Sequence, residues 1–160
     1  MIDQQGVLFQ DLFQKAVEAC FSDEKLSTDG GSILLKAADR RMGMLQALNA
    51  TLSDSRMPGK VDHPLAGLLA QRIYAIALGY PDGNDAARLK DDGMLKMLCD
   101  RDPSSDSTLG SQPTISRFEN ALNGRALLRL GQAYARTVLR YQQQGRRGAN
   151  QEQQHANEGK

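Results

Sequence analysis

Apolar side chains recur at three- and four-residue steps along most of the chain, which is the spacing of one face of an α-helix. This pattern predicts helices over residues 34–52, 65–78, 85–89, 92–99, 113–122 and 125–142. The stretch 65–78 is apolar almost all round, so we expect it to form the central, most buried helix. Gly, Pro, Asp and Ser gather between these stretches, as is typical of turns. The sequence therefore predicts a mainly α fold, a compact multi-helix domain.

The two ends of the chain are less regular. The apolar spacing over residues 5–21 favours an amphipathic helix, but the alternation at Val17, Ala19 and Phe21 fits a short N-terminal strand or hairpin equally well. Residues 143–160 are rich in Gln, Asn and Gly and almost free of apolar side chains, so we expect a disordered tail. The expected organisation is one helical region, 1–142, followed by a polar tail, 143–160.

Composition excludes several classes of protein. The chain has 160 residues, with 20 basic and 19 acidic side chains, so its net charge gives no argument for nucleic acid binding and only local charge can. It has two cysteines, Cys20 and Cys99, and two histidines, which leaves a zinc site or a disulfide scaffold poorly supported. The longest apolar stretch, 65–80, is too short to span a bilayer. We expect a soluble, cytoplasmic protein.

The segment 125–141 carries the clearest local charge. At 100° per residue, its arginines fall on one side of a helix and its large apolar side chains on the other. An arginine row without interleaved acids is typical of phosphate contact, whereas a solvated face usually has i,i+4 ion pairs. The residues predicted to contact phosphates are Arg125, Arg129, Arg136 and Arg140, and the apolar side comprises Leu127, Leu130, Tyr134, Val138 and Tyr141.

The segment 111–120 offers side chains that suit DNA base edges. Arg is well matched to guanine, and Asn or Gln to adenine. The outward-pointing residues of this predicted helix are Gln112, Ser116, Arg117 and Asn120. Together with the short helix 92–99 they could form a helix-turn-helix, although the intervening loop is longer than the usual turn. The alternative is an ordinary capped amphipathic helix.

Clustered aspartates raise the question of a metal site. The candidates are Asp82, Asp85, Asp91, Asp92, Asp100, Asp102 and Asp106. Their spacing does not match an EF-hand, and helix capping explains most of them, including Asp85 and Asp92. No set of nucleophile, base and orienting group can be assembled, so no catalytic residue and no metal ligand is predicted.

An ordered series of segments resembles the N-terminal region of DDE transposases of bacterial insertion sequences, in the group 1 DDE transposase family. The segments are 16–19 (AVEA), 26–31 (LSTDGG), 34–41 (LLKAADRR), 68–80 (LLAQRIYAIALGY), 84–85 (ND) and 109–120 (LGSQPTISRFEN). The resemblance covers residues 16–141, about four fifths of the chain.

The resemblance implies that, in this family, a helical N-terminal region leads into an RNase H-like domain. The acidic residues of that domain hold divalent metal ions such as Mg²⁺. After Tyr141 the chain has no apolar strand with an embedded acid, so we expect no enzyme and no cofactor in this chain. Asp29 is interpreted as a turn and cap residue. The expected function is binding of transposon-end DNA in the cytoplasm, at the nucleoid, in a truncated or remnant transposase. The alternative is a helical interaction module that associates with itself or with an intact transposase and modulates it. No membrane partner is expected.

Overall fold

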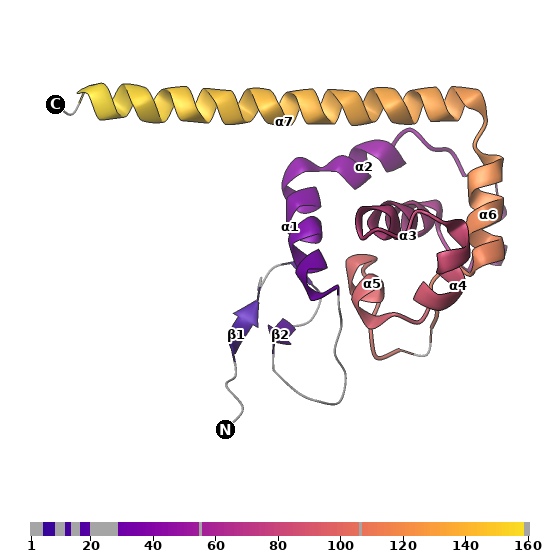
Figure 1. The fold of residues 1–160 in the computed structure, drawn as a ribbon. Coiled ribbons are helices and arrows are strands. Elements are labelled where there is room, and N and C mark those ends of the chain that lie inside the picture. The colour runs from indigo at the N-terminus through magenta and orange to yellow at the C-terminus, as the bar shows by residue number, and fades with distance from the viewer. Residues whose placement is uncertain are drawn as a thin grey trace.

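The structure is a computed structural model that describes residues 5–8, 12–13, 17–19, 29–54, 56–105 and 107–158. Seven α-helices build most of it, and the prediction of a mainly helical domain is confirmed (Figure 1). The α-helices are α1 (Ile33–Met42), α2 (Met44–Asn49), α3 (Leu65–Ala77), α4 (Ala86–Leu89), α5 (Gly93–Leu98), α6 (Gln112–Ala121) and α7 (Gly124–Glu158). Short 3₁₀ turns are η1 (Gly30–Ser32), η2 (Pro58–Lys60) and η3 (Gly83–Asp85), and the strands are β1 (Gln5–Leu8) and β2 (Val17–Ala19).

Helix α3 lies at the centre of the body, as its nearly all-round apolar sequence predicts (Figure 1). Leu68 and Leu69 belong to a core cluster with Ile115 and Phe118 of α6. One turn further, Tyr74 and other residues of α3 join a second cluster with Leu95 and Leu98 of α5. Because α3 contributes to both clusters, its burial holds the two halves of the domain together.

The predicted single helix over 34–52 is interrupted in the structure. Gly43 adopts φ 69°, a left-handed conformation that glycine reaches at little cost, and it ends α1. The Asp39 carboxylate accepts a hydrogen bond at 2.8 Å from the Leu45 N–H and so caps the start of α2. The periodicity of apolar residues continues through the break, which is why it did not reveal the change of helix.

At the N-terminus, a helix over 5–21 is wrong and the strand alternative is confirmed. Strands β1 and β2 pair antiparallel, with Gln5 opposite Ala19 and Leu8 opposite Val17. Their backbone groups therefore hydrogen-bond across the pair rather than along a helix. The rest of the predicted segment 5–21, apart from 12 and 13, lies outside the described residues.

Helix α7 runs along one side of the body and projects beyond it, while its first turn meets α6 at a sharp corner (Figure 1). It packs on α1 and α2. Ala126 and Thr137 of α7 are buried, and Leu130 and Ala133 pack against the core cluster that contains Leu68 and Ile115. The helix continues to Glu158, through the stretch that we expected to be without regular structure. Gln, Glu, Arg and Ala extend a preformed helix at little cost. Residues 142–147 are all exposed, so no packing supports the helix there.

Candidate nucleic-acid interface

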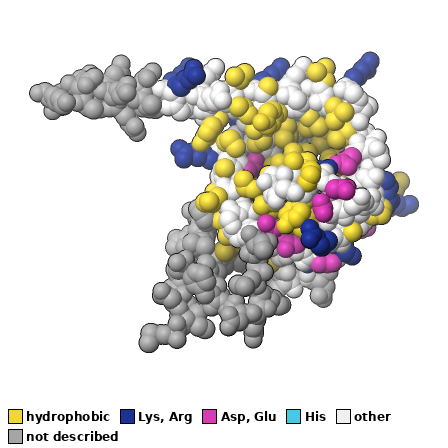
Figure 2. Space-filling view, viewed as in Figure 1, with side chains coloured by type: hydrophobic (Ala, Val, Ile, Leu, Met, Phe, Trp, Pro, Cys, Tyr) yellow, Lys and Arg dark blue, Asp and Glu magenta, His cyan; other side chains and the backbone are white. Residues whose placement is uncertain are grey.

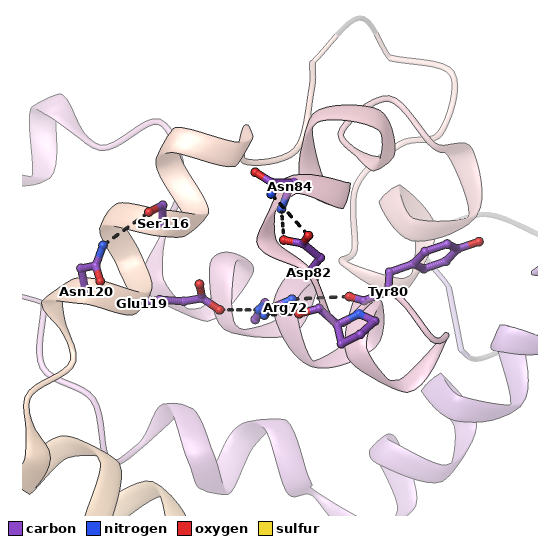
Figure 3. Close-up of polar contacts among 8 residues, drawn as sticks. Arg72, Tyr80, Asp82, Asn84, Ser116, Glu119 and Asn120 are labelled. Carbon is purple, nitrogen blue, oxygen red and sulfur yellow. Dashed lines mark hydrogen bonds and ion pairs between the residues drawn. The ribbon is translucent and has the colours of Figure 1, made fainter.

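Two contacts with α3 fix the position of α6. The Gln71 side chain, 2% exposed, donates to the Gly110 carbonyl at 2.8 Å and accepts from the Gly110 N–H at 2.9 Å. Further along, Glu119 forms an ion pair with Arg72, which also donates to the Pro81 carbonyl at 2.7 Å (Figure 3). These contacts hold the start and the end of α6 against α3, so its opposite side faces outward.

That outward side carries the four residues predicted to approach base edges. Arg117 and Asn120 are exposed, and Gln112 and Ser116 are half-buried. The Asn120 amide donates to the Ser116 hydroxyl at 3.4 Å, on the side of α6 away from Glu119 (Figure 3). The Arg117 Nε donates to the Pro113 carbonyl at 3.0 Å, and its other N–H donors have no hydrogen-bond partner among the residues that the structure describes. The structure thus brings the predicted residues together on one surface of one helix.

The helix-turn-helix interpretation fails, because α6 and α5 are not packed as its two helices. Helix α6 packs chiefly on η3, α3 and α4, whereas α5 packs on α3 and η1. The long loop between α5 and α6 allows α6 to pack beside α3 and α4 instead of on α5. The elements η3, α3 and α4, and not α5, therefore hold α6 with its outward face exposed.

The four arginines of α7 are all exposed but have two different surroundings. Arg129 donates to the Thr51 carbonyl at 3.3 Å, and Arg140 donates to the Met42 carbonyl at 3.0 Å. These carbonyls lie just past the end of α2 and at the end of α1, where the helix dipole is negative. Within the described part of the chain, Arg125 and Arg136 have no hydrogen bond or ion pair.

The apolar side of α7 also differs from the simple two-sided pattern. Leu127, Tyr134 and Tyr141 are exposed, whereas Leu130 and Val138 are half-buried. The residues that α7 buries lie one position earlier along the helix than the predicted apolar residues. They have small side chains: Ala126, Ala133 and Thr137. Sequence periodicity located the apolar side of this helix but not the part of it that the body covers.

A concave surface of about 550 Å³ joins the two predicted groups of residues. It lies between the segment 52–65 and the corner of α6 and α7, and both Arg117 and Arg129 line it. Its other basic side chains are Arg56 and Lys60, which sequence reasoning missed because no periodic pattern marks a loop. Its acidic side chains are Asp54 and Asp62, so four basic side chains outnumber two acidic ones.

Some of the charged side chains in this cleft neutralise each other, and the others give it a net positive charge. Arg56 is held by Asp54 through two hydrogen bonds, at 2.8 and 2.7 Å, and this pairing keeps the pKa of the Asp54 carboxyl below its usual value. The pKa of His63 is lowered, first by burial and then by the nearby charge of Arg101, so His63 is mostly neutral at pH 7. The excess positive charge therefore comes from Lys60, Arg117 and Arg129, against one remaining acid, Asp62.

The clustered aspartates act mostly in local structure. Asp82 accepts from the Asn84 N–H at 2.9 Å and Asp92 accepts from the Leu95 N–H at 2.7 Å, so the expected cap at Asp92 is confirmed. Asp85 makes no such cap and instead lies 3.8 Å from Arg88. Among the residues that the structure describes, no group of three or more His, Cys, Asp or Glu side chains could hold a metal ion.

Asp29, expected at a turn and cap, occupies the position before η1, where its carbonyl accepts from the Ser32 N–H at 2.8 Å. Its carboxylate gives no side-chain cap and accepts a hydrogen bond at 3.0 Å from the Tyr80 hydroxyl. The acid thus links the entry of α1 to the turn after α3.

A family model described as "Transposase DDE domain group 1" matches residues 9–147. The chain belongs to this DDE transposase family. The searches of curated proteins and of solved structures return no match. None of the described helices is long and apolar enough to cross a membrane.

Membership of the DDE transposase family corrects one expectation. We had expected no enzyme, on the ground that the family's catalytic domain would lie wholly past Tyr141. The matched model is that of the DDE domain itself, from a nuclease-type family of enzymes, and it covers most of the chain. The chain is therefore assigned to an enzyme family, and the absence of a familiar strand after Tyr141 was not a sufficient reason to exclude it.

Proposed function

We propose that this chain is the DNA-binding, N-terminal part of a bacterial insertion-sequence transposase and that it recognises transposon-end DNA. The observation that carries the proposal is the charge of α7. From 124 to 151 the helix has no Asp or Glu, and its basic residues are Arg125, Arg129, Arg136, Arg140, Arg146 and Arg147. Such a row suits the regularly spaced phosphates of a duplex.

The two kinds of arginine have different parts in the proposal. Arg125 and Arg136 contact phosphates directly, since their guanidinium groups are exposed and unpaired within the described residues. Arg129 and Arg140 each use a donor on a backbone carbonyl, which fixes the group and leaves other N–H donors for a phosphate. The cleft with Lys60 continues this positive surface towards α6.

Replacing both Arg125 and Arg136 with Gln is expected to weaken binding to any duplex. Each lost phosphate contact should reduce the slope of log K against log salt by about 0.9, so the double variant should lose close to two units. The measurement is fluorescence anisotropy with a random-sequence duplex between about 50 and 200 mM salt. The matched control replaces Arg88 and Lys90 with Gln, which removes the same charge from the α4 region. Equal slopes in the two double variants would contradict a specific role for α7.

Substitutions on α6 should act on specificity instead. After selection of a preferred site from a pool of random duplexes, Arg117→Ala or Asn120→Ala is expected to cost about 1–3 kcal/mol at that site. Binding to unrelated duplexes should change little, because base edges and not phosphates lose a partner. Arg88→Ala, at an exposed arginine of α4 outside both groups of residues, is the control. If the parent protein selects no site, or the α6 variants weaken all duplexes alike, α6 does not read bases.

A further inference from the structure

His63 lines the cleft between the segment 52–65 and the corner of α6 and α7. Its imidazole is half-buried, and neither ring nitrogen has a hydrogen-bond partner among the residues that the structure describes. The backbone at this position is held in place, because Arg56 donates to the His63 carbonyl at 3.1 Å. Both ring nitrogens are therefore available to a ligand in the cleft.

Positive charge prevails around His63 in the protein alone. Burial is the first cause that lowers the pKa of His63, and the charge of Arg101, in the chain just after α5, is the second. Asp62 acts in the opposite direction and does not cancel these effects, so the imidazole is mostly neutral at pH 7. The charged side chains around His63 and the cleft come from the segment 52–65, from α6 and α7 and from the chain after α5, and they are Asp54, Arg56, Lys60, Asp62, Arg101, Arg117 and Arg129.

A phosphate group in the cleft would reverse this balance. A nearby negative charge favours the charged form of a histidine and so raises its pKa. The protonated imidazole carries an N–H on both ring nitrogens, whereas the neutral ring has one donor and one acceptor. The oxygens of a phosphodiester only accept hydrogen bonds. Protonated His63 therefore suits this ligand better than neutral His63.

The cations of the cleft favour the same ligand. The Lys60 ammonium group has no hydrogen bond or ion pair within the described residues, and Arg117 and Arg129 each use one donor on a backbone carbonyl. Three parts of the fold thus supply positively charged donors, against one remaining acid, Asp62. We propose that the cleft binds a phosphate group and that His63 contacts this phosphate in its protonated form.

The phosphate comes from the backbone of a duplex, and this step rests on the proposed DNA binding. Figure 2 shows Lys and Arg side chains along α7, whereas the acidic side chains of the same face lie on the body. Ala126 and Arg129, in the first turns of α7, line the cleft. A duplex that lies along α7 therefore brings its phosphates to His63. A free phosphate ion offers the same chemistry, so the experiment compares both sources.

Protonation of His63 makes binding depend on pH. In the complex the pKa of His63 is higher than in the free protein, so binding takes up a proton in the pH range between the two values. Affinity then rises as the pH falls through this range. At lower pH the contribution of His63 is constant, because the ring is protonated with and without phosphate. Direct contact with a phosphate should raise the pKa by at least about one unit, which corresponds to about tenfold in affinity.

NMR measures the pKa of His63 directly from its ring protons between about pH 5 and 8, the range in which histidine changes its charge. The full chain is titrated alone, with a random-sequence duplex and with inorganic phosphate. Comparison with His63→Gln assigns the resonances, since the chain has two histidines. We expect both ligands to raise the pKa of His63, the duplex at a far lower concentration because it also contacts α7.

Two substitutions at the same position test the effect on affinity. In fluorescence anisotropy, the parent should bind the duplex about tenfold more tightly at about pH 5.5 than at about pH 8. His63→Gln should lose most of this gain, whereas His63→Lys, with a permanent charge, should bind tightly at both values. His155→Gln removes the other histidine and should keep the pH dependence of the parent. Circular dichroism should show similar thermal midpoints for all variants, because the His63 ring is only half-buried.

The proposal is overturned if His63 keeps the same pKa when the duplex is bound, or if the pH dependence of affinity is lost in His155→Gln and kept in His63→Gln. The proposed DNA binding would stand in both cases. A pKa that rises with inorganic phosphate alone would contradict the duplex as the source. If no duplex binds at any pH, the proposed function fails instead. The titration with inorganic phosphate then still decides whether the cleft is a phosphate site, because an unchanged pKa there would overturn the phosphate site as well.

Discussion

Replacing Gln71 with leucine is expected to lower the free energy of unfolding by about 2–5 kcal/mol, one of the two largest effects that the structure predicts. The Gln71 amide makes two hydrogen bonds with the backbone of Gly110, and both residues are buried. Leucine has a similar volume but no polar atoms, so the Gly110 N–H and carbonyl would both lose their partner away from water. Each buried group left without a hydrogen bond costs roughly 1–3 kcal/mol.

Urea denaturation followed by circular dichroism measures this effect. Gln46→Leu is the matched control, because Gln46 is an exposed residue of α2 and its substitution should change stability by less than about 0.5 kcal/mol. A Gln71→Leu variant as stable as this control would show that the Gly110 backbone finds another partner. The DNA-facing side of α6 would then not depend on α3 in the way described above.

Gln71 also illustrates where sequence reasoning ends. In the sequence it merely interrupts the apolar stretch 65–80. Its partner is 39 residues away in the loop before α6, and no local pattern connects the two. The apolar residues around it were sufficient to predict a buried helix, because burial of a helix depends on the average of many side chains. The role of a single polar residue depends on one specific contact.

The prediction of helices was right for some segments and wrong for others, and the spacing of apolar residues explains both outcomes. The apolar pattern found α3 and α6 because many of their apolar side chains belong to the two core clusters. It joined α1 and α2 because a single left-handed glycine changes the direction of the chain without changing the composition. It favoured a helix at the N-terminus because residues of two short strands can mimic helical spacing by chance.

The sequence predicted two separate groups of candidate DNA-binding residues, one on α6 and one on α7. It did not predict that one cleft joins the two groups. Each group, on α6 and on α7, follows from the spacing within its own helix. The contacts of Arg129 and Arg140 join residues 78 and 98 positions apart in the chain. Lys60 enters the same cleft from a loop with no periodic signal. Only the tertiary fold places Lys60, Arg117 and Arg129 around one cleft.

The second large effect concerns the close contact between Leu68 and Gly110. Leu68→Ala removes a side chain that is 2% exposed and should lower stability by about 2–5 kcal/mol through the cavity that it leaves. Gly110→Ala should lower stability by about 1–3 kcal/mol for the opposite reason. A Cβ at position 110 would lie 2.8 Å from Leu68 Cδ2 and 3.0 Å from Gln71 Oε1, so the core would have to move.

The double variant distinguishes this explanation from a general loss of stability. With Leu68 shortened to alanine, the closest atom to the new Cβ is gone, and the added methyl group fills part of the cavity. The cost of the double variant should therefore be smaller than the sum of the single costs by about 1 kcal/mol or more, measured as a double-mutant cycle in urea. Gly67→Ala serves as the control, since a Cβ there meets nothing within 4 Å and alanine suits the interior of α3. Strict additivity of Leu68→Ala and Gly110→Ala would show that the two residues do not compete for the same space, and the close approach of the α6 entrance to α3 would need another cause.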